Sequence, residues 1–257
     1  MTDRKTILWG ITDAEEKLFL SHMCDKCDKS ERSQRVVYTK FITPRQALLA
    51  KERLGGIYDI RFFGGFDGAE RTVAAIVPNE WEELQYPVCA IRIDNLGKRE
   101  LTHRDYLGSI LGLGITRDNA GDIVIGVDSA IVMVYSDIAD YIVTNLTKVG
   151  SCGVRIGITE DVSSLEITKS FKNLSATVSS MRLDCVIAAI INKSRSVSAD
   201  IISEGIVNVN YEAIKNVSYT VKDGDVISVR GYGKAIVETD LNLTKKGRIH
   251  INIRKYI

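Results

Sequence analysis

The chain has 257 residues, of which 45% are hydrophobic, so it can form packed cores and is not a disordered protein. Its longest apolar run, Cys185 to Ile191, has 7 residues, well short of the roughly 18 that a membrane helix needs. The N-terminus leads into no apolar signal-peptide core, and the five cysteines are an odd number. We therefore expect a cytoplasmic protein without membrane contact and with reduced thiols.

The net charge of +1 is unevenly distributed along the chain. Residues 1–180 hold 22 basic and 25 acidic side chains, whereas residues 181–257 hold 12 and 8. A basic C-terminal quarter indicates a domain that faces a polyanion.

The fold class expected from the pattern is α+β, and it begins with an N-terminal α/β module over residues 1–87. Thr43 suits a helix N-cap and Pro44 the first helical position, where a missing N–H costs nothing. The predicted elements are helices over 15–29 and 44–54, then strands over 57–63 and 71–77.

Residues 88–158 are predicted to form a β-α-β-β-α-β module, which is the ferredoxin-like order found in many RNA-recognition domains. The strands are expected over 88–93, 122–127, 130–135 and 153–158, and the helices over 102–111 and 136–146. An RNA-recognition motif places base-stacking aromatics on its central strands. Ile123, Ile125, Ile131 and Val134 take those positions here, and Tyr135 is the only aromatic. We therefore expect this module to contact RNA through loops and phosphates, or to bind protein.

Residues 159–180 are polar and rich in serine and threonine, which is typical of a connector, although Leu165 and Ile167 are candidates for a short strand. Helical spacing then resumes at Leu183, with apolar residues at offsets 3, 4, 7 and 8. Ser196 is a candidate N-cap for a second helix, which Gly205 would end. Strands are expected over 206–210 and 226–229.

The basic groups of residues 181–257 lie at the joints of these elements. Arg195 precedes the second helix, whose free N–H groups favour phosphate. The candidate RNA contacts are Arg182, Lys193, Arg195, Arg230 and Lys234, with Ser194 as a hydroxyl donor. Such a module can bind structured RNA by its shape and backbone.

Four motifs in this region resemble the S4 RNA-binding domain. They are Arg182-Leu-Asp184, Ser194-Arg195, Gly205-Ile-Val-Asn-Val-Asn210 and Gly224-Asp-Val-Ile-Ser-Val-Arg-Gly231. The departures are Tyr211, where the S4 pattern has a turn glycine, and Lys234, where arginine is common. The resemblance implies an S4 domain over 181–257.

The rest of the chain resembles the bacterial YlmH family. The residues that carry this likeness are His103-Arg-Asp-Tyr-Leu-Gly108, Leu111-Gly-Leu-Gly-Ile115, Gly121-Asp-Ile123 and Lys245-Lys-Gly-Arg248…Arg254-Lys-Tyr256. The resemblance implies a non-enzymatic protein, monomeric when free, that acts on the large ribosomal subunit during rescue of stalled translation. Its implied partners are ribosomal RNA and tRNA, with no cofactor.

Other chemistries have weaker support. Cys24-x-x-Cys27 with His22 lacks the four ligands of a structural zinc site, so we expect two helix cysteines and no metal. His103 and Asp105 lie two residues apart on a predicted helix and would not converge for acid–base catalysis. With Arg99 and Arg104, His103 is instead a possible additional RNA contact.

Three alternatives remain open. Arg182-Leu-Asp184 resembles the catalytic motif of pseudouridine synthases, but the residues that follow differ, and Asp184 is expected to cap its helix or to pair with a nearby arginine. An RNA-modifying enzyme that uses the S4 domain for substrate delivery is the main alternative function. A protein-docking role for residues 1–87 is the third.

Overall fold

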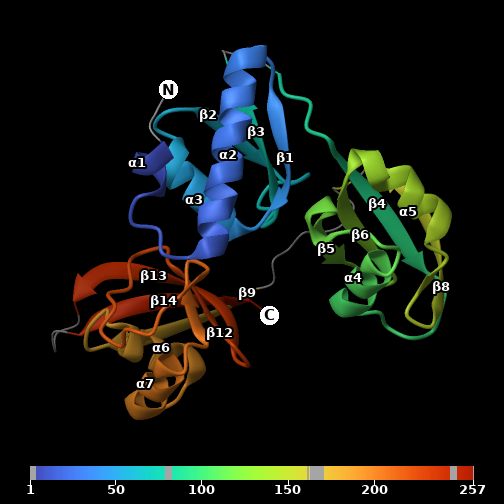
Figure 1. The fold of residues 1–257 in the computed structure, drawn as a ribbon. Helices are drawn as coiled ribbons and strands as arrows, with labels where there is room; N and C mark the ends of the chain where they lie inside the picture. Colours follow the sequence, from blue (N-terminus) through green and yellow to red (C-terminus); the bar gives the residue numbers. More distant parts are fainter. Residues whose placement is uncertain (1–3, 79–82, 161, 163–170, 244–247, 257) are drawn as a thin grey trace. The chain divides into compact units, whose positions relative to one another are not determined.

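The structure is a computed structural model that describes residues 4–78, 83–160, 162, 171–243 and 248–256. The chain divides into two compact units, residues 1–167 and 168–257, and each is described separately (Figure 1). The predicted α+β class is confirmed: helices pack against three antiparallel sheets. The candidate strand at Leu165 and Ile167 lies outside the described residues.

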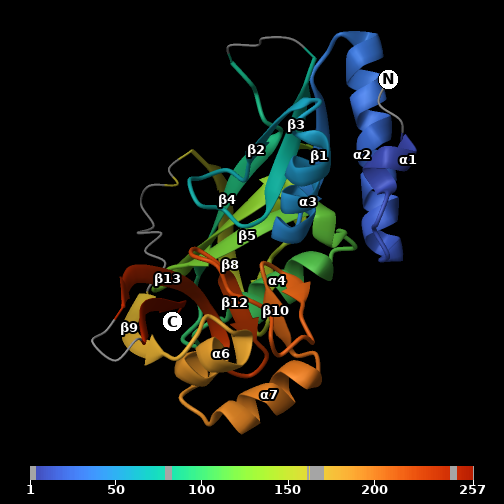
Figure 2. The same cartoon turned by 90° about the vertical axis from the view of Figure 1, so that its left-hand side faces the viewer.

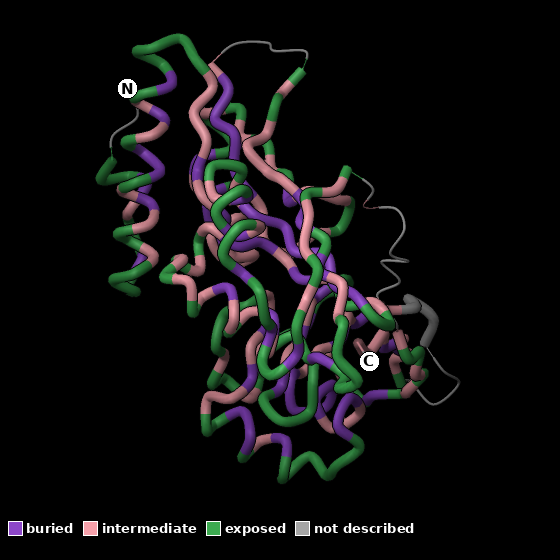
Figure 3. Tube along the Cα trace, turned by 90° about the vertical axis from the view of Figure 1, so that its right-hand side faces the viewer, coloured by how far each residue is buried: buried purple, intermediate pink, exposed green. Residues whose placement is uncertain are grey.

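The first unit begins with helices that cover a three-stranded sheet of order β1-β3-β2 (Figures 1 and 2). Leu20 and Met23 of the long second helix pack with Leu49, Leu54 and Ile76. Buried residues recur every three or four positions along that helix, with exposed residues between them, which is the pattern of a helix with one face on a core (Figure 3). The elements are α1 Arg4–Leu8, α2 Ala14–Ser33, β1 Val37–Ile42, α3 Pro44–Leu54, β2 Asp59–Phe63 and β3 Thr72–Val77.

Two of these elements, α1 and β1, were not expected from the sequence. The predicted start of α3 is confirmed, because the Thr43 side chain accepts a hydrogen bond from the N–H of Gln46 in a capping box, and Pro44 follows. Strand β1 has buried residues that do not alternate, so it carries no period of two.

The second part of this unit has the β-α-β-β-α-β order that the sequence predicts, with a short β7 added. All neighbouring strands are antiparallel, in the order β5-β6-β4-β8-β7. Ile91 and Ile93 pack with Tyr106, Ile110 and Ile142 on the helical side of the sheet. The elements are β4 Val88–Asn95, α4 His103–Leu111, η1 Arg117–Asn119, β5 Ala120–Ile125, β6 Ser129–Tyr135, η2 Ser136–Ile138, α5 Ala139–Asn145, β7 Lys148–Val149 and β8 Cys152–Thr159.

The other face of this sheet packs against the N-terminal sheet. Phe41 and Val73 from one sheet form a core with Ala90, Ile131 and Met133 from the other. This corrects the sequence analysis, which grouped Ile123 and Val134 with Ile131 on one face, whereas both belong to the helical side. Tyr135 is covered as well, by the Nζ of Lys40 at 3.5 Å from its ring centre. The face that would present stacking aromatics is therefore largely occupied by protein.

The second unit is a six-stranded antiparallel sheet of order β11-β10-β12-β13-β14-β9, with α6 and α7 on one side (Figure 1). Its core includes Leu183, Val186 and Ile187 of α6, so the predicted apolar stripe is confirmed. The elements are β9 Phe171–Val178, α6 Leu183–Ile191, α7 Arg195–Ser203, β10 Val207–Val209, β11 Glu212–Ala213, β12 Val226–Val229, β13 Gly233–Leu243 and β14 Ile249–Tyr256.

Strand β9 lies inside the segment that the sequence analysis interpreted as a connector, residues 159–180. It pairs with β14 along its whole length, from Phe171↔Tyr256 to Val178↔Ile249. Asn173, Ser175 and Thr177 lie on one side of this edge strand, while Leu174, Ala176 and Val178 lie on the other and pack with the core. The connector interpretation is therefore wrong for residues 171–178.

Candidate nucleic-acid interface

Two of the predicted RNA contacts, Arg182 and Arg195, meet at a buried aspartate. The Nε of Arg182 lies 3.1 Å from Oδ1 of Asp184, and the Nη2 of Arg195 lies 2.6 Å from Oδ2. Only 6% of the Asp184 side chain is exposed, whereas 42% of Arg182 and 57% of Arg195 remain exposed. One carboxylate thus holds two guanidinium groups at the surface, and the three charges sum to +1.

The protonation of Asp184 follows from these contacts. Burial disfavours its charged form, but the hydrogen bonds from Arg182 and Arg195 outweigh burial and lower the pKa of Asp184 to about 2. The carboxylate is therefore ionised at neutral pH. A guanidinium group has five N–H donors, so each arginine can bind Asp184 and still donate outward to a phosphate.

Ser194 and Lys193 lie beside this pair, in the turn between α6 and α7. Ser194 is the N-cap of α7, and its hydroxyl oxygen accepts a hydrogen bond from the N–H of Val197 at 3.3 Å. This corrects the expected cap at Ser196, which lies within the first turn of the helix. The bond leaves the Ser194 hydroxyl proton for donation, as the sequence analysis predicts. Lys193 is exposed. Together with the positive end of the α7 dipole, these groups form a cationic surface at the helix joint.

Arg230 and Lys234 lie at the other end of α7. Both line a shallow pocket of about 500 Å³ that begins at Gly205, directly after the helix. At 1.5 Å per residue, the ten residues from Arg195 to Gly205 span about 15 Å along the helix. The Nζ of Lys234 lies 3.2 Å from the Oη of Tyr211, whose backbone takes the left-handed conformation (φ +68°) that glycine would adopt without strain. The six predicted residues therefore belong to one unit and form two groups.

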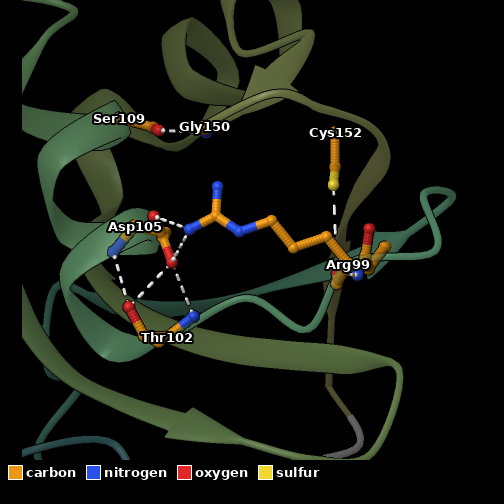
Figure 4. Close-up of polar contacts among 7 residues, drawn as sticks. Arg99, Thr102, Asp105, Ser109, Gly150 and Cys152 are labelled. Carbon is orange, nitrogen blue, oxygen red and sulfur yellow. Dashed lines mark hydrogen bonds and ion pairs between the residues drawn. The ribbon is translucent and has the colours of Figure 1, made fainter.

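The possible additional contacts belong to the first unit. Figure 4 shows Arg99 reaching Asp105, with its Nη2 at 3.0 Å from Oδ1, while the other carboxylate oxygen accepts from the Thr102 N–H at 2.8 Å. Partial desolvation by the surrounding protein and the positive charge of Arg117 lower the pKa of His103, although its side chain still reaches solvent. His103 and Arg104 are exposed at the start of α4. Asp105 is thus part of the helix cap and of an ion pair, and nothing in this geometry brings it to His103.

The cysteine pair has the surroundings of core residues. Cys24 and Cys27 are buried in α2, and burial raises the pKa of Cys27 to about 12 and that of Cys24 above its usual value. Cysteine binds metal ions as the thiolate, and this buried environment disfavours the thiolate form. Among the described residues no cluster of three His, Cys, Asp or Glu side chains is placed to hold a metal ion. In the same part of the chain, no helix has the length and apolar character to cross a membrane.

Comparisons with known proteins give a family match in each of the two units. The family model described as "Putative RNA-binding domain in YlmH" matches residues 82–162, and the S4 domain model matches residues 181–227. A relative from Bacillus subtilis (strain 168), named ribosome-associated protein quality control protein P2, is 29% identical over 246 residues. The match covers 94% of this chain and 95% of that protein.

A solved structure shares the fold of part of the chain. The cell division protein ylmH from Streptococcus pneumoniae superimposes with a TM-score of 0.52 and 23% identity. The match covers 62% of this chain and 99% of that one.

Proposed function

The chain belongs to the YlmH family of proteins with an S4 domain, and on this premise we propose that it is a non-enzymatic factor that binds ribosomal RNA and tRNA. We place this activity on the large ribosomal subunit during rescue of stalled translation. The relative that matches nearly the whole chain is named for ribosome-associated quality control, and that name is not an enzyme name.

The observation that carries the proposal is the Asp184 clamp. Arg182, Asp184 and Arg195 fall inside the region that matches the S4 model, and the clamp fixes two exposed guanidinium groups without neutralising them. Guanidinium groups bind phosphate through paired N–H donors. Because the side chains are already oriented, less conformational entropy is lost when RNA binds.

The proposal predicts salt-dependent association with the large subunit. The purified protein should sediment with large subunits through a sucrose gradient at low salt and leave them as salt rises, because phosphate contacts release counterions. Lys193→Ala and Arg195→Ala should each reduce the slope of log affinity against log salt by about one. Lys51→Ala, which removes an exposed cation from α3, should leave the slope unchanged.

Two results would contradict the proposal. A protein that stays in the free fraction at low salt does not bind the subunit. If Lys193→Ala and Arg195→Ala both leave the salt dependence of the affinity unchanged, the RNA contact lies elsewhere. Nucleoside analysis by mass spectrometry, after incubation of the protein with methyl donor and bulk RNA, tests the non-enzymatic part. A modified nucleoside above background would favour the RNA-modifying alternative.

A further inference from the structure

A second concave surface of the C-terminal unit lies between the edge strand β9 and helix α6. It is a groove of about 770 Å³, a volume within the roughly 300–1,000 Å³ of small-molecule sites. Leu174 of β9 and Ile253 of β14 line it from the sheet, and Ala188 and Ala189 line it from α6. Because the helix residues are small, helix and strand do not close over the apolar floor.

The cations at this groove are Lys172, Arg195, Arg248 and Lys255, and among the described residues that line it there is no aspartate or glutamate. Lys172 and Lys255 are cross-strand partners. Since side chains alternate along a strand, Lys172 lies on the same face as Leu174, and Lys255 on the same face as Ile253. Positive charge therefore lies directly beside apolar surface on one sheet face.

Arg195 connects the groove to the cationic surface at the helix joint. Its guanidinium is held by Asp184 at 2.6 Å, and the same side chain lines the groove. A strand of RNA that contacts the helix joint thus meets the groove at Arg195 without a gap in positive charge. An acidic peptide would satisfy the cations equally well, but it would not explain why the groove continues from the proposed RNA surface.

We infer that the groove between β9 and α6 receives an unpaired nucleotide of the bound RNA, with its base on Leu174, Ala188 and Ala189 and its phosphates on the lining cations. The combination of apolar floor and basic rim suits a nucleotide, whose base is flat and poorly hydrated while its backbone is anionic. The inference rests on the proposed function, and it adds that the S4 unit distinguishes unpaired from paired RNA.

The test uses the full chain and three synthetic RNA hairpins that differ at one position. One has a bulged uridine, one has an abasic bulge, and one is fully paired. The wild-type protein should bind the uridine hairpin about tenfold more tightly than the other two, measured by fluorescence anisotropy. With 4-thiouridine in the bulge, ultraviolet crosslinking should join the RNA to peptides from residues 171–178 or 249–256.

A variant that fills the groove provides the second arm. Ala189→Leu adds bulk on α6 without changing charge, and it should bind the three hairpins with equal affinity while keeping the affinity of the wild type for the paired one. Ala199→Leu, the same change on α7 outside the groove lining, should keep the tenfold preference. The crosslink is measured on the wild type, so it decides the question even where Ala189→Leu fails to fold.

The outcomes separate the inference from the proposed function. Equal wild-type affinity for the three hairpins, or a crosslink confined to other peptides, overturns the inference and leaves RNA binding in place. Binding of an acidic peptide that Ala189→Leu abolishes, with no preference among the hairpins, assigns the groove to a protein partner and also overturns it. Failure to bind any hairpin or the large subunit overturns both.

Discussion

At the scale of single residues, the main feature is the carboxylate of Asp184, whose second arginine partner cannot be predicted from the sequence. The expectation that Asp184 pairs with a nearby arginine is confirmed, and it pairs with two, one of them eleven residues away. Breaking a buried ion pair leaves an uncompensated charge and is costly, whereas the pair itself contributes modestly. Asp184 therefore fixes the position of Arg182 and Arg195 more than it adds affinity for RNA.

The pH dependence of stability tests this clamp. The pKa of Asp184 is about 2 in the folded chain against an ordinary 3.8, so its contribution is complete above about pH 4 and is lost as pH falls toward 2. The difference corresponds to about 2 kcal/mol. Asp184→Asn should lower the free energy of unfolding by about that amount at pH 7, and its difference from wild type should narrow between pH 4 and pH 2. Urea unfolding at several pH values measures both.

The control is Asp200→Asn, on the exposed surface of α7, which should leave the free energy of unfolding nearly unchanged at every pH. If the free energies of unfolding of wild type and Asp184→Asn differ by the same amount at pH 7 and at pH 3, the arginine contacts do not lower the pKa of Asp184.

At the scale of elements, local signals place helices well because their capping residues are neighbours in sequence. Thr102 and Asp105 form a reciprocal cap at the start of α4: the Asp105 N–H donates to Thr102 Oγ1 at 3.3 Å, and the Thr102 N–H donates to the Asp105 carboxylate (Figure 4). Thr43 and Gln46 do the same for α3. These starts are the ones that the sequence predicts.

The cap of α4 predicts a measurable loss. Thr102→Ala removes the acceptor for the Asp105 N–H and should lower the free energy of unfolding by about 1 kcal/mol in urea titrations. Thr102→Ser keeps a hydroxyl at the same position and should stay within a few tenths of a kcal/mol of wild type. If both variants are equally destabilised, the threonine methyl group, and not the cap, stabilises this helix end.

Strands were predicted less completely because their partners are distant. The residues of β9 are mostly polar and at most half-buried, so the sequence alone is typical of a loop. The strand forms because it pairs with β14, which lies far away in sequence: the Ser175 hydroxyl donates to Asn252 Oδ1, 77 residues later. The same gap explains why the candidate site was predicted only in part. The cations at the helix joint belong to a local motif, whereas the groove exists only once β9 is paired.

At the scale of the whole chain, the sequence predicts three modules, whereas the structure divides into two compact units. Residues 1–87 and 88–158 have separate helical cores but share a third core between their sheets, formed by residues such as Phe41, Ile131 and Met133. The guanidinium of Arg71 strengthens this junction, because it donates to the carbonyls of Ala120 and Phe41. The sequence does not reveal this junction. The continuous apolar runs of β3 and β6 are typical of strands buried on both faces, but they do not say which surface covers each face.

The shared core predicts that residues 1–167 unfold as one cooperative unit. Gly121 lies at this junction, and a Cβ there would come within 2.6 Å of the Phe41 ring and 2.9 Å of the Met133 Cβ. Gly121→Ala should therefore lower the free energy of unfolding by about 1–3 kcal/mol through overpacking. Gly157→Ala, on β8 with open space at the Cβ position, is the matched control and should stay close to wild type.

Hydrogen exchange measured on peptides at increasing urea concentration can isolate this unit, because it reports separately on residues 1–167 and 168–257. Gly121→Ala should shift the transitions of peptides from both sheets of the first unit by the same amount, while those from residues 168–257 stay in place. Different shifts for the two sheets would mean that they unfold separately. An equal shift in peptides from residues 168–257 would mean that the two units are coupled in folding, so that RNA contacts made by the C-terminal unit would also stabilise the N-terminal one.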